Sequence, residues 1–201
     1  MIQRIFGITV GTLFMGIFMG CATTSNPVSI FYSPAGEARG GSGNLFLKTE
    51  SNRTVRNNAG SIRWAIGKQK DADGLVTNEI LSESSQEDMM LDAIKRELTA
   101  AGYSVESGAT MPPGVTKGVD LTTVQIEVDE TASIPKIEAT GKVKISLDVW
   151  KKGVVVKKLN YESEVSDTAI INRDRLPREI IERGLRGVLR RAVPDIVSVL
   201  E

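Results

Sequence analysis

Residues 137–149 read Ile-Glu-Ala-Thr-Gly-Lys-Val-Lys-Ile-Ser-Leu-Asp-Val, with an apolar or small residue at every second position. Glutamate, threonine, lysine, serine and aspartate fill the positions between them. Successive side chains of a strand point to opposite faces, so this run predicts a long strand with one buried face and one face in water. It decides the fold class, because such a strand needs paired neighbours and a second layer over its apolar face.

Shorter patterns supply those neighbours. Residues 124–129 alternate in the same way before the run, and residues 154–165 follow it after a Lys-Lys-Gly turn. The three segments predict an antiparallel meander. Apolar runs at 45–47 and 62–66 add two candidate strands nearer the N-terminus.

Two amphipathic segments predict the helices. The first covers about residues 85–101, with Ser84 and Glu87 as a capping box and Gly102 as the C-terminal cap. The second starts at about Leu176, and Pro194 should kink it because proline removes one backbone hydrogen bond.

The order of strands, helix, meander and helix predicts an α+β fold. We expect a two-layer sandwich in which both helices pack on one face of a mainly antiparallel sheet. This single domain should span residues 44–201.

The N-terminus has the pattern of a secretory signal. Arg4 precedes an uncharged apolar run, Ile5–Met19, which is shorter than the roughly 20 residues of a membrane span. The sequence Phe18-Met19-Gly20-Cys21 resembles the lipobox of bacterial lipoproteins. In that family the signal, here residues 1–20, is removed and the cysteine carries lipid on its sulfur and its amine.

The lipobox resemblance implies that Cys21 is the lipid attachment site. Ala22 follows it, and in Gram-negative lipoproteins a residue other than aspartate there directs sorting to the outer membrane, facing the periplasm. Residues 22–43 are rich in serine, threonine, proline, glycine and alanine. With Cys21 they predict a lipidated, flexible tether over residues 21–43.

Composition excludes several classes of chemistry. The chain has no histidine and one cysteine, so histidine-based catalysis, internal disulfides and thiolate metal clusters are absent. Its 25 basic and 25 acidic residues balance, which argues against a nucleic-acid partner. Local matches to a Ser-x-x-Lys motif at 133–136 and a calcium loop at 71–74 lack their companion residues. We therefore expect a protein that is not an enzyme and that needs no cofactor or metal.

Two surface features are candidates for contact with a partner. Arg183, Arg186 and Arg190 share one face of the second predicted helix, where their guanidinium groups could meet lipid headgroups or an acidic protein. Trp150 falls on the polar register of its strand, beside a turn. The alternatives are a solvated helix face with local glutamate partners, and a tryptophan that packs under the tether.

The order of these features resembles the YajG-like family of bacterial lipoproteins. The resemblance lies in the lipobox at Cys21, the helix ending Leu-Thr-Ala-Ala-Gly-Tyr at 98–103, the segment 119–126, the hairpin 137–165 and the terminal Val-Pro-Asp-Ile-Val at 193–197. Auxiliary lipoproteins of ABC-type lipid transport, such as PqiC-like proteins, have a similar layout. Both resemblances imply a location and a fold, and neither implies catalytic residues.

These observations lead to two hypotheses about function. The first is a membrane-anchored, non-enzymatic lipoprotein that presents a scaffold or interaction module to an envelope protein. The second is an auxiliary component of an envelope transport system that binds lipid or lipopolysaccharide in an apolar groove between helices and sheet.

Overall fold

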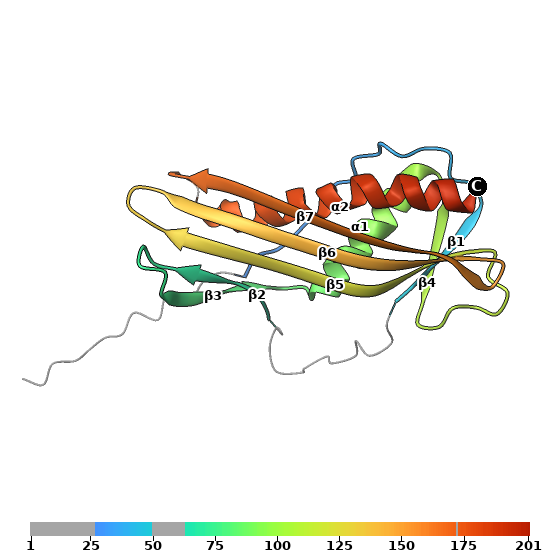
Figure 1. Cartoon of the computed structure of the whole chain (residues 1–201), viewed down its shortest axis with the longest axis horizontal. Coiled ribbons are helices and arrows are strands. Elements are labelled where there is room, and N and C mark those ends of the chain that lie inside the picture. Colours follow the sequence, from blue (N-terminus) through green and yellow to red (C-terminus); the bar gives the residue numbers. More distant parts are fainter. Residues whose placement is uncertain (1–26, 50–62, 172) are drawn as a thin grey trace, which may run out of the picture.

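The computed structural model describes residues 27–49, 63–171 and 173–201 (Figure 1). The predicted signal segment and Cys21 lie outside these residues. The elements, in chain order, are β1 (Asn44–Lys48), β2 (Trp64–Lys70), β3 (Val76–Ser82), α1 (Gln86–Ala101), β4 (Ser104–Gly108), β5 (Lys117–Ala132), β6 (Ile137–Lys151), β7 (Val154–Ala169), a short 3-10 turn (Arg173–Arg175) and α2 (Leu176–Leu200).

The predicted meander is confirmed and forms one side of the sheet, with β7 as its edge strand. β5, β6 and β7 pair antiparallel over almost their whole length. On its other edge β5 pairs with β1 near its start and with β2 near its end, and both pairings are parallel. β4 pairs parallel to β1, and β3 antiparallel to β2. Within the described residues, seven strands therefore form one mixed sheet.

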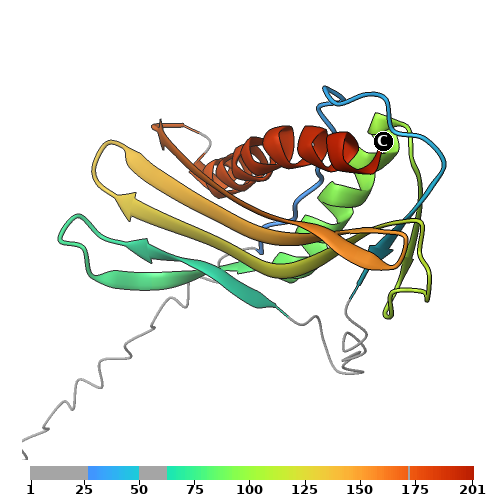
Figure 2. The ribbon, with the colours of Figure 1, turned by 45° about the vertical axis from the view of Figure 1, so that its right-hand side comes forward.

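The predicted mainly antiparallel two-layer sandwich is wrong. The sheet is mixed, and it curls around the helices as a half-barrel (Figure 2). Strands of 15 or 16 residues accumulate a large twist, and register shifts at Leu121–Thr123 and Val149–Trp150 add local bends. The α+β class and the two helices remain as expected.

Both helices lie in the concave side of the sheet, and α2 packs tightly against β6. A Cβ atom added to Gly141 would lie 2.2 Å from Ile180 Cγ2, and one added to Gly184 would lie 2.7 Å from Val143 Cγ2. Each glycine thus lets a large apolar side chain of the opposite layer fill the space. Helix and sheet are in close contact at these points, where the lipid-transport hypothesis expected an apolar groove.

The start of the first helix and its N-cap each lie one residue later than predicted. Ser85, not Ser84, is the N-cap, and its Oγ accepts a hydrogen bond from the Asp88 N–H at 3.0 Å. The chain offers two adjacent serines, and the turn geometry after β3 selects the second. Gly102 caps the other end with a φ of 115°, as predicted. α2 runs without interruption from Leu176 to Leu200 through Pro194.

The segment 27–43, which we call the strap, lies against the body of the domain. Val28 N–H donates to the Leu81 carbonyl at 2.7 Å, and Gly41 N–H donates to the Ala101 carbonyl at 3.0 Å. Between these points Tyr32 is buried, with 3% of its surface exposed. The flexible tether was predicted to reach residue 43, but the docked chain already begins at residue 27.

Glu97 of α1 holds the middle of the strap. Its buried carboxylate accepts hydrogen bonds from Tyr32 Oη at 2.6 Å, Ala35 N–H at 2.7 Å and Gly36 N–H at 3.4 Å. Burial and the adjacent Glu97 carboxylate raise the pKa of Tyr32 above its usual range, so Tyr32 stays protonated and donates. The network fixes the strap across the helices.

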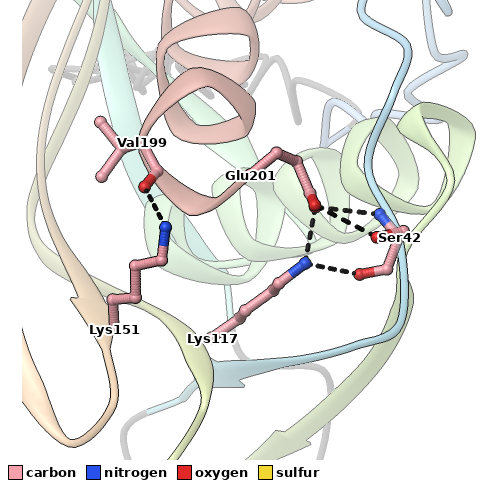
Figure 3. Close-up of polar contacts among 5 residues, drawn as sticks. All are labelled: Ser42, Lys117, Lys151, Val199 and Glu201. Atoms are coloured by element: carbon pink, nitrogen blue, oxygen red, sulfur yellow. Dashed lines mark hydrogen bonds and ion pairs between the residues drawn. The ribbon is translucent and has the colours of Figure 1, made fainter.

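The C-terminal end of α2 is closed by charged groups from the sheet and the strap (Figure 3). Glu201 Oε1 accepts from Lys117 Nζ at 2.7 Å and from Ser42 N–H at 3.1 Å, and Lys151 Nζ donates to the Val199 carbonyl at 3.1 Å. The last turn of α2 has no basic residue of its own. Lys117 and Lys151 therefore supply the positive charge that favours a helix C-terminus. We call this arrangement the C-terminal latch.

Candidate functional site

A cavity of about 530 Å³ lies inside the curl, at the end opposite the C-terminal latch. The start of the strap, β2, β3, β5, β6 and the first turn of α2 contribute to its walls. Val28, Ile80, Leu81 and Ile137 supply apolar surface. We call this space the end cavity. Its volume falls in the range of small-ligand sites in proteins.

Glu130 of β5 lines the end cavity and is buried, with 3% of its surface exposed. It follows Ile126 and Val128 on the inner face of the strand, where the alternation calls for a third apolar residue. One carboxylate oxygen accepts a hydrogen bond from Gln69 Nε2 at 3.1 Å. An ionisable group in such a position lowers stability unless it is fully paired, so its presence indicates a use other than packing.

The surroundings of Glu130 favour its neutral form. Burial raises the pKa of the Glu130 carboxyl, and the negative charge of Asp174 adds to this effect. The hydrogen bond from Gln69 acts in the opposite direction. A cation or a strong hydrogen-bond donor entering the cavity would relieve the cost of the buried charge.

Two arginines of α2 also line the end cavity. Arg175 stands at the N-terminal end of α2, and Arg178 lies within its first turn. Arg178 Nε donates to Glu182 Oε1 at 2.8 Å along the helix. The cavity thus combines apolar surface, the buried Glu130 carboxylate and two guanidinium groups suited to phosphate or carboxylate. Two further acidic residues also line it, Glu79 and Asp174.

A second hollow, of about 570 Å³, lies near the C-terminal latch between β1, β4 and the loop before β5. It is shallower, and its charged residues Glu106 and Lys117 are not buried. Lys117 already pairs with Glu201. The end cavity is therefore the stronger candidate.

None of the sequence-predicted contact residues lines the end cavity. Arg183 pairs with Asp167 of β7 at 2.6 Å, and Arg190 pairs with Glu37 of the strap at 2.8 Å. The Arg186 guanidinium lies near the Tyr32 hydroxyl, and its Nε is buried without a partner among the described residues. The arginine face thus holds the strap and β7 to the helix, and its contact with headgroups stays a prediction.

Trp150 lies on the outer face of β6, near the β6–β7 turn. It is partly exposed, but its indole N–H is shielded and meets no hydrogen-bond acceptor in the described part of the chain. A Cβ on Gly118 would meet Met111 Sδ at 2.9 Å and Trp150 Cβ at 3.3 Å, so the loop before β5 covers this side of the strand. Partner contact through Trp150 also stays a prediction.

Sequence reasoning missed Glu130 and Glu97. For Glu130 a signal exists, since a carboxylate replaces an apolar residue in the register of Ile126 and Val128. Glu97 adjoins Leu98 in the apolar stripe of α1, but only the docked strap explains its burial.

Neither a metal site nor a membrane-crossing helix is found where the structure can be described. Across residues 27–49, 63–171 and 173–201, no three potential metal ligands come together. In the same segments, no helix has the combination of length and apolar character that crossing a bilayer requires.

Comparisons with known proteins give structural likeness alone. No protein-family model matches the sequence, and no curated protein matches it. A minor lipoprotein from Acinetobacter baumannii is 9% identical at a TM-score of 0.43, over 66% of this chain and 90% of that chain. Rare lipoprotein B from Shewanella oneidensis is 12% identical at a TM-score of 0.37, over 67% and 98%.

A protein of the DUF330 family from Xanthomonas campestris is 12% identical at a TM-score of 0.44, over 86% of this chain and 95% of that chain. The solved structures that this chain is similar to thus include bacterial lipoproteins. At identities and TM-scores this low, the likeness assigns no activity, ligand or partner to the chain.

Proposed function

We propose that the chain is a lipid-anchored envelope lipoprotein whose domain binds an amphiphilic ligand, a membrane lipid, in the end cavity. The observation that carries this proposal is the buried Glu130 carboxylate beside a cavity of about 530 Å³. The lipobox at Cys21 supports the anchor, and Ala22 favours the outer membrane, with the domain in the periplasm.

The chemistry of the end cavity defines the ligand class. Its apolar wall fits part of an acyl chain, and Glu130 fits an amine or another hydrogen-bond donor. Arg175 and Arg178 fit an acidic group of the same headgroup. An aminophospholipid combines all three features, so phosphatidylethanolamine is the probe of choice.

The proposed activity is binding without catalysis. General acid–base catalysis needs a side chain within hydrogen-bond reach of the proton that moves, most often a histidine. The chain has no histidine, and its one cysteine is the proposed lipid attachment site. In the end cavity Glu130 accepts a hydrogen bond from Gln69 and shares the walls with Asp174, Arg175 and Arg178. This mixture of charges favours recognition of a headgroup.

The experiment is a titration of the mature, unlipidated Cys21→Ser chain with short-chain phosphatidylethanolamine below its micelle concentration. Calorimetry should show saturable binding of one lipid. Glu130→Gln should weaken binding roughly tenfold or more, because a hydrogen bond to a charged group contributes about 1.5–3 kcal/mol.

Glu127→Gln is the matched control, since Glu127 lies on the same strand but on its exposed outer face. Its affinity should equal that of the parent chain. Absence of saturable binding, or equal weakening by both substitutions, would remove the end cavity as the lipid site.

The second candidate function is a scaffold that binds an envelope protein. The observation that favours it is β7, a 16-residue strand that pairs only with β6 within the described sheet. An open edge of this kind can accept a strand from a partner. Crosslinking from the exposed residue Val156 in intact cells should capture one envelope protein if this role holds, and no product would argue against it.

A further inference from the structure

Exposed apolar side chains gather at the end of the sheet that holds the end cavity. Nine large apolar residues are exposed in the described part of the chain, and five of them lie at this end. These are Leu75, Val76, Ile134, Ile170 and Ile171. We call them the apolar tips. Ile134 is 99% exposed and Ile171 is 78% exposed, so neither contributes to the core.

The strand register places the apolar tips side by side. One row crosses the sheet through Val76, Lys70, Thr131, Glu138 and Thr168. The β2–β3 turn, the β5–β6 turn and the end of β7 all lie just beyond this row, at the left in Figure 1. Three separate segments thus present apolar side chains at the same end.

The charges near the apolar tips are compensated in part, since Asp71 and Asp73 of the β2–β3 turn form no ion pair among the described residues, and the Asp71 carboxylate accepts hydrogen bonds from backbone N–H groups of its own turn. Lys70 pairs with Asp129 at 3.2 Å, and Lys136 pairs with Glu138. Electrostatic attraction to a strongly charged partner is therefore a poor explanation of this surface. Five exposed apolar side chains gathered at one end instead fit an apolar environment.

The position of the strap relates this end to the lipid anchor. Val28 hydrogen-bonds to Leu81 of β3, and Leu81 pairs with Ala65 of β2. The register between β2 and β5 puts Ala65 near Ile126, so Val28 lies at about the level of Ile126 along the sheet. From Ile126 to the tip of β5 is about 20 Å, and to its start about 30 Å, at 3.3 Å per residue. Val28 runs parallel to β3, away from the tips, so the chain enters the strap from the side of the tips.

The length of chain before the strap then decides which end can meet the membrane. Cys21 is seven residues before Val28. Seven residues span at most about 25 Å, less than the roughly 30 Å to the start of β5. Cys21 can therefore lie level with the apolar tips. It cannot lie level with Val154 and its exposed neighbours at the opposite turn.

We infer that the apolar tips rest in the headgroup region of the bilayer that holds Cys21. This inference depends on the proposed lipid anchor. The domain would then stand on the membrane on this end, with the end cavity nearest the lipid and the C-terminal latch farthest from it. Insertion of exposed apolar side chains at the interface removes them from water, which supplies the attraction.

The test uses the full-length lipidated protein in phosphatidylethanolamine–phosphatidylglycerol vesicles. Acylation blocks Cys21, so a cysteine introduced by Ile134→Cys is the one reactive thiol and can carry an environment-sensitive fluorophore. Val154→Cys is the matched control, an exposed apolar residue at the opposite turn. The label at position 134 should shift to shorter emission wavelength and be quenched by spin-labelled lipid, while the label at 154 should not.

Three results would overturn the inference. They are a label at 134 that stays in water, equal quenching at both positions, and quenching at 154 alone. Leu75→Cys, on a different turn, repeats the measurement in case the first variant folds poorly, and should report the same environment as position 134.

A second experiment distinguishes an error in the inferred membrane contact of the apolar tips from an error in the proposed lipidation of Cys21. If the protein does not float with vesicles and its mass shows no acyl groups, the anchor is wrong, whatever the tips do. The unlipidated Cys21→Ser chain then tests the tips alone. Ile134→Asp with Ile171→Asp should lower its vesicle binding roughly tenfold or more, since charge is expelled from lipid. An unchanged affinity would overturn the inference.

Discussion

The two ends of the curled sheet differ in how well their polar and apolar groups are satisfied. At the C-terminal latch, charged side chains satisfy the end of α2, and Glu201, Lys117 and Ser42 bond to one another. At the other end, Glu130 is buried with one amide as its hydrogen-bond partner, and five apolar side chains face outward. The first end is explained by stability, whereas the second carries features that stability does not require. Such departures from local rules are where function is expected.

The strap runs between these two ends, and Glu97 holds its middle. Of the substitutions considered, removal of the Glu97 carboxylate should change the free energy of unfolding most. Glu97→Ala leaves the Tyr32 hydroxyl and the strap amides without their acceptor. We expect it to lower the free energy of unfolding by about 2–4 kcal/mol, since removing one partner of a buried charged network is costly. Chemical denaturation measures it, and Glu83→Ala at an exposed position should change stability little. A small effect of Glu97→Ala would mean that the strap is loosely held.

Removing the Glu130 carboxylate from the end cavity should raise the stability of the protein, whereas removing Glu97 lowers it. The folded state raises the pKa of Glu130, so ionisation opposes folding, and the cost grows as pH rises above the ordinary value near 4.5. Glu130→Gln should therefore stabilise the ligand-free protein at pH 7 and raise its Tm above that of the wild type. At pH 3 the gain should vanish, because the wild-type carboxyl is then protonated in both states. A destabilised variant at pH 7 would show that Glu130 is structural.

The latch should show the reverse dependence on pH and the smallest effect. The Lys117 ammonium lowers the pKa of Glu201 to about 2. The Glu201 carboxylate thus stabilises the fold at pH values above 4.5, its ordinary pKa in the unfolded chain. This stabilisation is lost as pH falls toward 2. Hydrogen exchange at the Ser42 amide, corrected for intrinsic rates, should lose protection in that window. Lys117→Ala should weaken this protection already at neutral pH, and equal protection in both proteins would contradict the latch.

Sequence patterns predicted the elements better than their arrangement. The alternation at 137–149 and the amphipathic stripes of both helices depend on burial of one face, which local sequence records. The choice of partner for β1 and β2 depends on contacts distant in sequence, so their parallel pairing to β5 was not predicted. β3 and β4 were missed because neither has a long apolar alternation.

The candidate site was harder to predict than the fold. Arg183 and Arg190 looked available because their partners, Asp167 and Glu37, are distant in sequence. The strap looked flexible from its composition, and only the position of Glu97 on α1 shows why it docks. Glu130 was visible in the alternation of β5, but its cavity is formed by elements from across the chain.

The most direct test of the central claim, that the end cavity binds a membrane lipid, is native mass spectrometry of residues 22–201, exported behind a cleavable secretory signal without a lipobox and purified gently from the periplasm. We predict a fraction of the protein with the added mass of one phospholipid, which is reduced in Glu130→Gln and unchanged in Glu127→Gln. The account would be contradicted if none of the three proteins carried added lipid mass. It would also be contradicted if the fraction with bound lipid were the same in Glu130→Gln as in the parent chain.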